Sequence, residues 1–240
     1  RIGYIAGAIS HCILGGIGAA LYLRQVHGAT WIDPMAGAVA AALISALVIG
    51  IVSMRARQRE DTVIGALWAL GMAVGLVFLA RTPGYVDPMS YLFGNILLVS
   101  RGDLILLAVL DAIVVLLAWR GYFQLEASAF DEEFARTRGV PTDAVFLIIL
   151  GITAVAVVVL QTFVGIVMVI AMLTLPAGTA GYFAKNLGRM MLIGSGLSLA
   201  FSLIGLVVSW RLDLPSGAVV VLVAGAVFLA VSALRMRRKA

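Results

Sequence analysis

Long apolar runs separated by short polar connections dominate the chain. A helix needs about 20 mainly apolar residues to cross the hydrocarbon core of a bilayer, and about eight runs approach that length. Only residues 161–163 separate the fifth and sixth runs, so this pair forms either a tight hairpin or one broken helix. The pattern predicts an all-α, polytopic transmembrane helical bundle of about eight spans: 4–23, 35–54, 63–80, 103–119, 144–161, 164–181, 190–209 and 217–234.

Two further features refine this topology. Pro176 lies inside the sixth run, where a proline removes a backbone hydrogen bond, so we expect it to break that span. The apolar segment from Tyr91 to Val99 is too short to cross a bilayer. It predicts a re-entrant or interfacial helix between the third and fourth spans.

The composition supports a membrane protein. Hydrophobic residues make up 62% of the 240 and charged residues 12%, whereas soluble domains carry about 45–50% and about 25%. The formal net charge is +5, but the basic residues are scattered between apolar runs. No basic face with interleaved aromatic residues exists for nucleic acid, so we expect no nucleic-acid partner.

The lysines and arginines predict the orientation of the spans, because cytoplasmic loops carry an excess of them. If Arg1 is cytoplasmic and the spans alternate, 13 of the 17 basic residues fall on the cytoplasmic side. Both ends of the chain are then cytoplasmic, as is the loop 121–143. The basic residues left on the outer side are Arg24, Arg81, Arg101 and Arg211.

His11 is the first candidate functional residue. Gly3, Gly7, His11 and Gly15 recur every four residues, so they share one face of the first helix. Small residues in such a row let another helix approach closely, which directs the imidazole into a helix contact or cavity. The histidine is therefore either a metal ligand on a transport pathway or a packing residue hydrogen-bonded to a neighbouring helix.

Asp111 is the second candidate, because it lies midway along the fourth predicted span among apolar neighbours. An acid at that depth must be protonated, paired or facing water. It could serve a cation relay or bond to another helix. By contrast, the single cysteine, Cys12, excludes an intrachain disulfide and is typical of a small buried hydrophobe. Gly71 and Gly75 form a second helix-packing row.

The loop 121–143 contains a short predicted helix. Its acidic front and basic back suit a helix dipole, and Gly139 suits the helix end. Phe130 and Phe134, four residues apart, place two rings on one side. We expect this face to dock on a partner protein; an interfacial helix lying on the membrane is the alternative. The candidate docking residues are Phe130, Asp131, Glu132, Glu133, Phe134, Ala135 and Gly139.

The sequence holds no motif for energy conversion or catalysis. It lacks a phosphate-binding glycine loop, a His-Glu-x-x-His pair and a Gly-x-Ser-x-Gly turn. We therefore expect no enzymatic activity, with any ATP hydrolysis on a separate chain. A carrier that uses Asp111 as a proton relay is the alternative.

Five segments resemble the permease subunits of bacterial zinc/manganese ABC importers. They match in order, and the resemblance extends over nearly the whole chain. The first has His11 followed by glycines, and the fourth is the Phe130–Gly139 region. The segments are Ala8–Gly16, Glu60–Gly65, Asp87–Leu97, Phe130–Gly139 and Leu173–Ala180.

This resemblance implies a homodimeric permease in the bacterial cytoplasmic membrane, formed by one domain, 1–240, that lacks an upstream first helix. The implied partners are a cytoplasmic ATPase and an extracytoplasmic metal-binding protein. No cofactor is implied, and the divalent metal ion is the transported substrate. His11 would be its ligand, and Asp111 could complete the site, because Gly7 replaces the acid that the family has there. A siderophore- or cobalamin-type permease is the alternative within this class.

Overall fold

The computed structural model describes residues 2–55, 60–83 and 99–237, and within these ranges every regular element is a helix. This confirms the all-α prediction. The predicted re-entrant segment from Tyr91 lies outside the described residues, except for Val99. The helices are α1 (Ile2–Val26), α2 (Pro34–Arg55), α3 (Glu60–Arg81), α5 (Arg101–Arg120), α6 (Tyr122–Phe130), α7 (Glu132–Thr137), α8 (Thr142–Val164), α9 (Ile166–Gly181), α10 (Leu187–Leu212) and α11 (Ser216–Arg237).

Seven of the described helices are long and apolar enough to cross a membrane: α1, α2, α3, α5, α8, α10 and α11. The remaining predicted span, 164–181, corresponds to α9, which has only 16 residues. The polytopic helical fold is therefore confirmed, with one predicted span shorter than the others.

The break between α8 and α9 lies at Gly165, not at residues 161–163 as the apolar pattern suggested. α8 continues through Gln161 to Val164, and Gly165 alone separates it from Ile166. The backbone of Gly165 has φ 77° and ψ 163°, a region that essentially only glycine enters. The chain thus forms two helices with a one-residue junction.

Pro176 does not end α9, contrary to expectation, because the helix continues to Gly181. Hydroxyl groups near the proline bond to the helix backbone: Thr174 donates to the Ile170 carbonyl at 2.8 Å and Thr179 to the Leu175 carbonyl at 2.7 Å. Threonine side chains and neighbouring helices are what make proline tolerable inside membrane helices.

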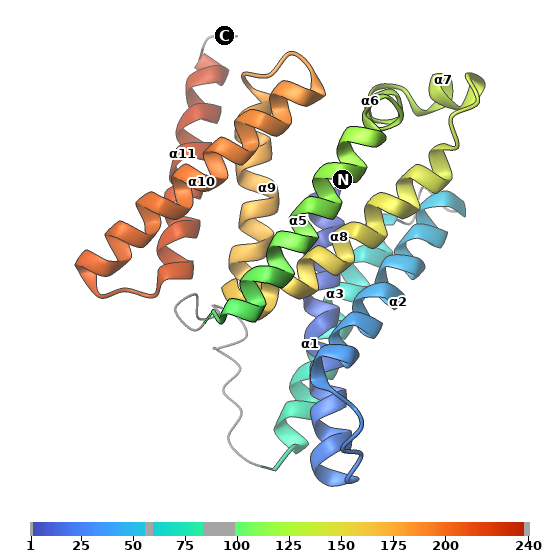
Figure 1. Ribbon diagram of the computed structural model, residues 1–240, viewed down its shortest axis with the longest axis vertical. Coiled ribbons are helices and arrows are strands. Elements are labelled where there is room, and N and C mark those ends of the chain that lie inside the picture. Colours follow the sequence, from blue (N-terminus) through green and yellow to red (C-terminus); the bar gives the residue numbers. More distant parts are fainter. Residues whose placement is uncertain (1, 56–59, 84–98, 238–240) are drawn as a thin grey trace. The chain divides into compact units, whose positions relative to one another are not determined.

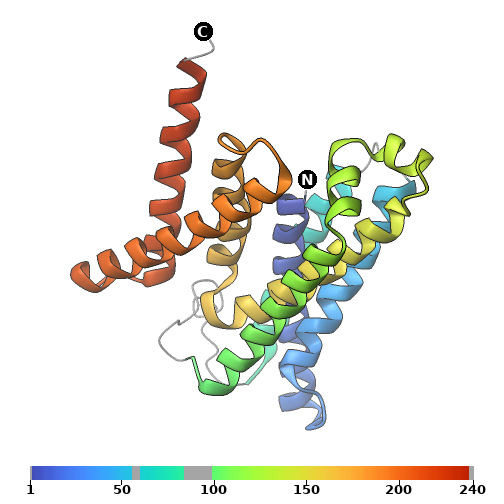
Figure 2. The same ribbon diagram turned by 45° about the horizontal axis from the view of Figure 1, so that its top comes forward.

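The chain divides into two compact units, the first formed by Arg1–Pro88 and Val99–Leu160. Its core is α1, which packs between α2 and α3 (Figures 1 and 2). Glycines make these contacts possible. A Cβ atom on Gly71 would lie 2.6 Å from the Cα of Cys12, and one on Gly37 would lie 2.6 Å from the Gly16 carbonyl oxygen. The predicted close helix packing at the glycine rows is confirmed.

The second unit comprises Met89–Leu98 and Gln161–Ala240. Within its described part, α9, α10 and α11 pack against one another. A Cβ on Gly205 of α10 would lie 2.7 Å from the Cα of Val220 in α11. The hydroxyl of Tyr182 bonds to Ser232 at 3.0 Å.

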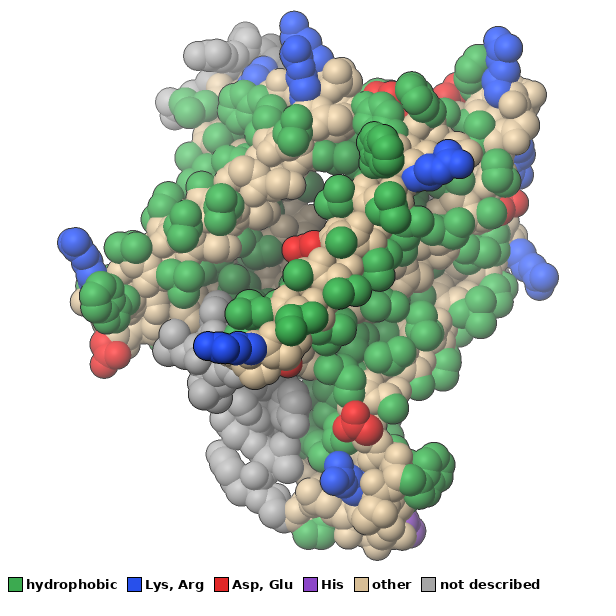
Figure 3. Space-filling view, in the orientation of Figure 1, with side chains coloured by type: hydrophobic (Ala, Val, Ile, Leu, Met, Phe, Trp, Pro, Cys, Tyr) green, Lys and Arg blue, Asp and Glu red, His purple; other side chains and the backbone are tan. Residues whose placement is uncertain are grey.

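Apolar side chains cover the outer faces of the spans. α5 has no buried residue at all, and Ile105 and Val115 are 66% and 67% exposed. Hydrophobic side chains cover much of the visible helix surface, while most charged groups lie near helix ends (Figure 3). Such surfaces are stable when they face lipid or pack against another membrane subunit.

Candidate functional site

His11 lies on α1 where that helix faces α3, and it is only 8% exposed. Its ring stacks on Trp68 of α3, with 4.5 Å between ring centroids and 28° between planes. The indole also contacts Tyr4, at a centroid distance of 5.9 Å. The histidine therefore lies in a tight helix contact, as the glycine row predicted, and not on the outer surface of the bundle.

A backbone hydrogen bond determines which nitrogen of His11 is available. Nδ1 lies 2.9 Å from the carbonyl oxygen of Gly7. A carbonyl can only accept, so Nδ1 carries the hydrogen in the neutral ring and Nε2 keeps its lone pair. No hydrogen bond from the described residues reaches Nε2. The imidazole can thus offer one nitrogen to a cation.

Asp111 does not join His11. It lies on α5 and is exposed, and within the described ranges no hydrogen bond or ion pair connects the two side chains. No group of three or more His, Cys, Asp or Glu residues gathers there either. The expected two-residue metal site is therefore not formed in this structure of one chain.

The predicted helix Phe130–Gly139 is interrupted at Asp131, which separates α6 from α7. Phe130 is the last residue of α6, and Phe134 belongs to α7. Asp131 has an extended backbone, and its carboxylate accepts a hydrogen bond from the Phe134 amide at 2.9 Å. Aspartate is a strong N-cap, because it satisfies an amide that has no partner within the helix. The two phenylalanines therefore do not share one helix face. The i, i+4 spacing had predicted that they would.

Gly139 ends α7 in the manner its position predicted. Its φ is 82°, and two backbone bonds of 3.1 Å close the helix: the Gly139 amide donates to the Arg136 carbonyl, and the Val140 amide donates to the Ala135 carbonyl. This pair of bonds is the Schellman motif, in which glycine supplies the left-handed residue.

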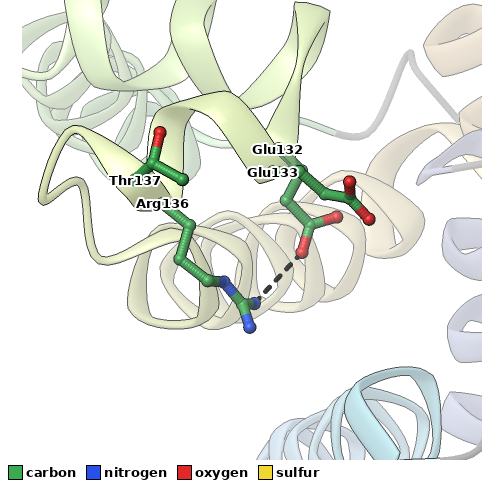
Figure 4. A pocket seen from close by; sticks show the side chains of 4 residues that line it. All are labelled: Glu132, Glu133, Arg136 and Thr137. Atoms are coloured by element: carbon green, nitrogen blue, oxygen red, sulfur yellow. Dashed lines mark hydrogen bonds and ion pairs between the residues drawn. The ribbon is translucent and has the colours of Figure 1, made fainter.

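Arg136 connects α7 to the start of α8. Its Nη2 donates to Glu132 at 3.3 Å and to Asp143 at 2.6 Å, and its Nε donates to Thr142 at 3.2 Å. A shallow hollow lies beside this arginine, lined also by Glu133 and Thr137 (Figure 4). One guanidinium group thus links the short helix to a predicted membrane span.

α7 presents an aromatic group to its surroundings. Phe134 is 55% exposed and Phe130 is 73% exposed, whereas Ala135 is buried. The Arg138 guanidinium lies 5.2 Å from the centre of the Phe134 ring. Ala135 therefore attaches α7 to the unit, while the two rings remain available to a partner.

Trp68 is the site residue that sequence reasoning missed. It lies in an apolar run, where a tryptophan is normally part of the helix packing or the membrane interface. Its importance arises from the pairing of α1 with α3, which the pattern of one helix does not reveal. The absence of a side chain at Gly7, four residues before His11, was the only sign in the sequence that a bulky group packs beside the histidine.

Comparison with known proteins identifies the family. The family model described as "ABC 3 transport family" matches residues 1–235. The chain belongs to the ABC 3 transport family. It is 39% identical over 230 residues to the uncharacterized membrane protein slr2045 of Synechocystis sp., covering 95% of this chain and 79% of that protein.

Two other relatives of this ABC 3 family chain have names that refer to metals. The manganese transport system membrane protein MntC of Halalkalibacterium halodurans is 37% identical, with 92% of this chain and 74% of that protein covered. A probable metal transport system membrane protein of Chlamydia trachomatis is 34% identical, with 95% and 78% covered.

A solved structure has the same fold. The structure titled "PsaBC from Streptococcus pneumoniae in complex with Fab" matches with a TM-score of 0.76 and 26% identity, covering 96% of this chain and 86% of that one. The family and the fold of this chain are thus established together.

Proposed function

We propose that this ABC 3 family chain is the membrane-spanning permease of an ATP-driven importer of divalent metal ions. The family match over residues 1–235 carries this proposal. The names of the manganese and metal transport relatives support the class of cargo. The ion is a substrate that passes through the chain and leaves it, and the chain itself performs no chemistry.

The proposed assembly has two copies of this chain in a bacterial cytoplasmic membrane. An external binding protein delivers the ion, and a cytoplasmic ATPase supplies the energy. The excess of basic residues on one side favours a cytoplasmic location for both ends of the chain and for the loop 121–143. An acidic, aromatic helix in that loop fits a protein surface better than an anionic membrane.

α7 is the element that we assign to the ATPase. Its exposed Phe134 ring offers an aromatic anchor, and two acidic residues, Glu132 and Glu133, begin the helix. Aromatic side chains at the centre of an interface commonly carry most of the binding energy. The Arg136 bonds to α8 would transmit a movement of α7 to a membrane span.

Co-purification with the partner ATPase tests the proposal. Phe134→Ala removes the anchor, and hot-spot truncations cost about 2 kcal/mol or more, so the amount of ATPase retained by the tagged permease should fall at least tenfold. Phe183→Ala is the matched control, because Phe183 is 54% exposed but lies outside the loop 121–143. Undiminished ATPase binding after replacing both Phe130 and Phe134 would contradict the assigned docking surface.

A further inference from the structure

The face of α1 that carries His11 holds no second side chain able to bind a metal. Residues three and four positions away along a helix share its face. For His11 these are Gly7, Ala8, Leu14 and Gly15, all of them glycine or apolar. A cation that reaches His11 therefore finds only the imidazole on this face of the helix.

Trp68 is the reason that position 7 has no side chain. A Cβ atom on Gly7 would lie 2.6 Å from Cζ3 and 2.9 Å from Cη2 of the indole. Real Cβ atoms do not approach other atoms so closely, and a wide, rigid ring in a helix contact has little freedom to withdraw. An aspartate at position 7 is incompatible with Trp68 in its present place.

The same indole orients the histidine. Its stacking at 4.5 Å holds the plane of the imidazole, while the 2.9 Å bond from Nδ1 to the Gly7 carbonyl holds the rotation of the ring. Both contacts leave Nε2 as the nitrogen with a free lone pair. Such supporting contacts commonly determine how well a histidine ligand binds its metal.

A single neutral imidazole distinguishes between divalent metal ions. Nitrogen ligands suit Zn²⁺, whereas Mn²⁺ is best held by carboxylate, carbonyl and water oxygens. A transported ion must also leave its site, so a small number of ligands is compatible with passage.

We propose that Trp68 is a positioning and specificity residue, which excludes a carboxylate at position 7 and presents Nε2 of His11 as a lone nitrogen ligand, so that the permease favours Zn²⁺ over Mn²⁺. The inference rests on the proposed function for its cargo class. It adds the residue that sets the preference and the direction of that preference.

The test compares Zn²⁺ and Mn²⁺ in the complete complex of permease and ATPase, with direct binding measured in detergent and ATP-driven uptake measured in proteoliposomes. Wild type should bind Zn²⁺ more tightly and reach half-maximal uptake at a lower concentration of Zn²⁺ than of Mn²⁺. Trp68→Ala should weaken Zn²⁺ binding by about 10–100-fold, the usual effect of losing an orienting partner, with a smaller change in maximal rate. Trp68→Phe, which keeps a ring face, should stay close to wild type.

A second pair of variants separates positioning from folding. Gly7→Asp alone should reduce assembly, because the new side chain meets the indole. Gly7→Asp combined with Trp68→Ala provides the space, so this double variant should assemble and shift the preference toward Mn²⁺. Equal affinities of wild type for the two ions, or an unchanged Zn²⁺ to Mn²⁺ ratio in an assembled double variant, would overturn the role of Trp68.

The two claims fail in different ways. Selective Zn²⁺ binding without ATP-driven uptake retains the role of Trp68 and rejects the importer. ATP-driven uptake without a Zn²⁺ preference retains the importer and rejects the role of Trp68.

Discussion

At the scale of single residues, His11 is the side chain on which the proposed pathway depends. It is buried in a contact between α1 and α3, its Nδ1 is bonded to the backbone, and one nitrogen is left for a ligand. A polar group in a membrane helix is costly. In the proposed pathway, Nε2 of His11 is the nitrogen that the transported ion would bind.

His11→Ala should abolish high-affinity metal uptake while the permease still assembles with its ATPase. The change removes the only nitrogen donor on that helix face but leaves the glycine contacts of α1 in place. Radioactive zinc uptake measured beside co-purification checks both statements. His27→Ala is the control, since His27 lies in an exposed loop, and normal high-affinity uptake by His11→Ala would remove this residue from the pathway.

Gly139 permits a second prediction at this scale. Its φ of 82° suits glycine, and a side chain with L chirality costs about 1–2 kcal/mol in that conformation. Gly139→Val should therefore loosen the end of α7 and weaken ATPase binding, measured as retained ATPase. Gly139→Asn should have a smaller effect, because asparagine tolerates this conformation. Equal binding by the Val and Asn variants would show that the helix end does not control docking.

At the scale of elements, glycines set the distance between α1 and its neighbours. A Cβ on Gly71 would meet the backbone of Cys12 at 2.6 Å, whereas one on Gly151 of α8 would meet nothing within 4 Å. Backbone atoms cannot move aside as a flexible side chain can. The two glycines therefore differ in their tolerance of the same substitution.

Gly71→Ala should lower the free energy of unfolding by about 1–3 kcal/mol, the usual effect of overpacking. Gly151→Ala should leave it equal or slightly higher, because alanine is the better helix former. Reversible unfolding in mixed micelles measures both variants. A Gly71→Ala permease as stable as the Gly151→Ala variant would mean that α1 and α3 are not in close contact.

The sequence predicted features that arise within one helix, and it missed those that depend on a local backbone choice or on a second helix. Apolar runs located the spans, and the glycine rows located close packing. The break at Asp131 depends on a capping bond, and the junction at Gly165 depends on a backbone conformation that many glycines never adopt. Trp68 acquires its place only when α3 lies against α1, and the same lack of pairing information led us to expect Asp111 beside His11.

At the scale of the whole molecule, the family match and the distribution of residues agree on a membrane component of a transport system. The described spans offer apolar faces to lipid or to a second subunit, and the loop 121–143 offers a short capped helix held by Arg136. The sequence has no nucleotide-binding loop. The proposed importer requires that energy reach this chain through contact with an ATPase on another chain.

The rate of zinc uptake into proteoliposomes tests this requirement most directly. Vesicles with the permease and its ATPase, and vesicles with the permease alone, are compared with ATP and with an imposed pH gradient. We expect uptake only when the ATPase and hydrolysable ATP are both present. Asp111→Asn should leave this uptake unchanged, because the importer does not use Asp111 as a proton relay. Uptake by the permease alone under a pH gradient, lost in Asp111→Asn, would contradict the importer and establish a proton-coupled carrier instead.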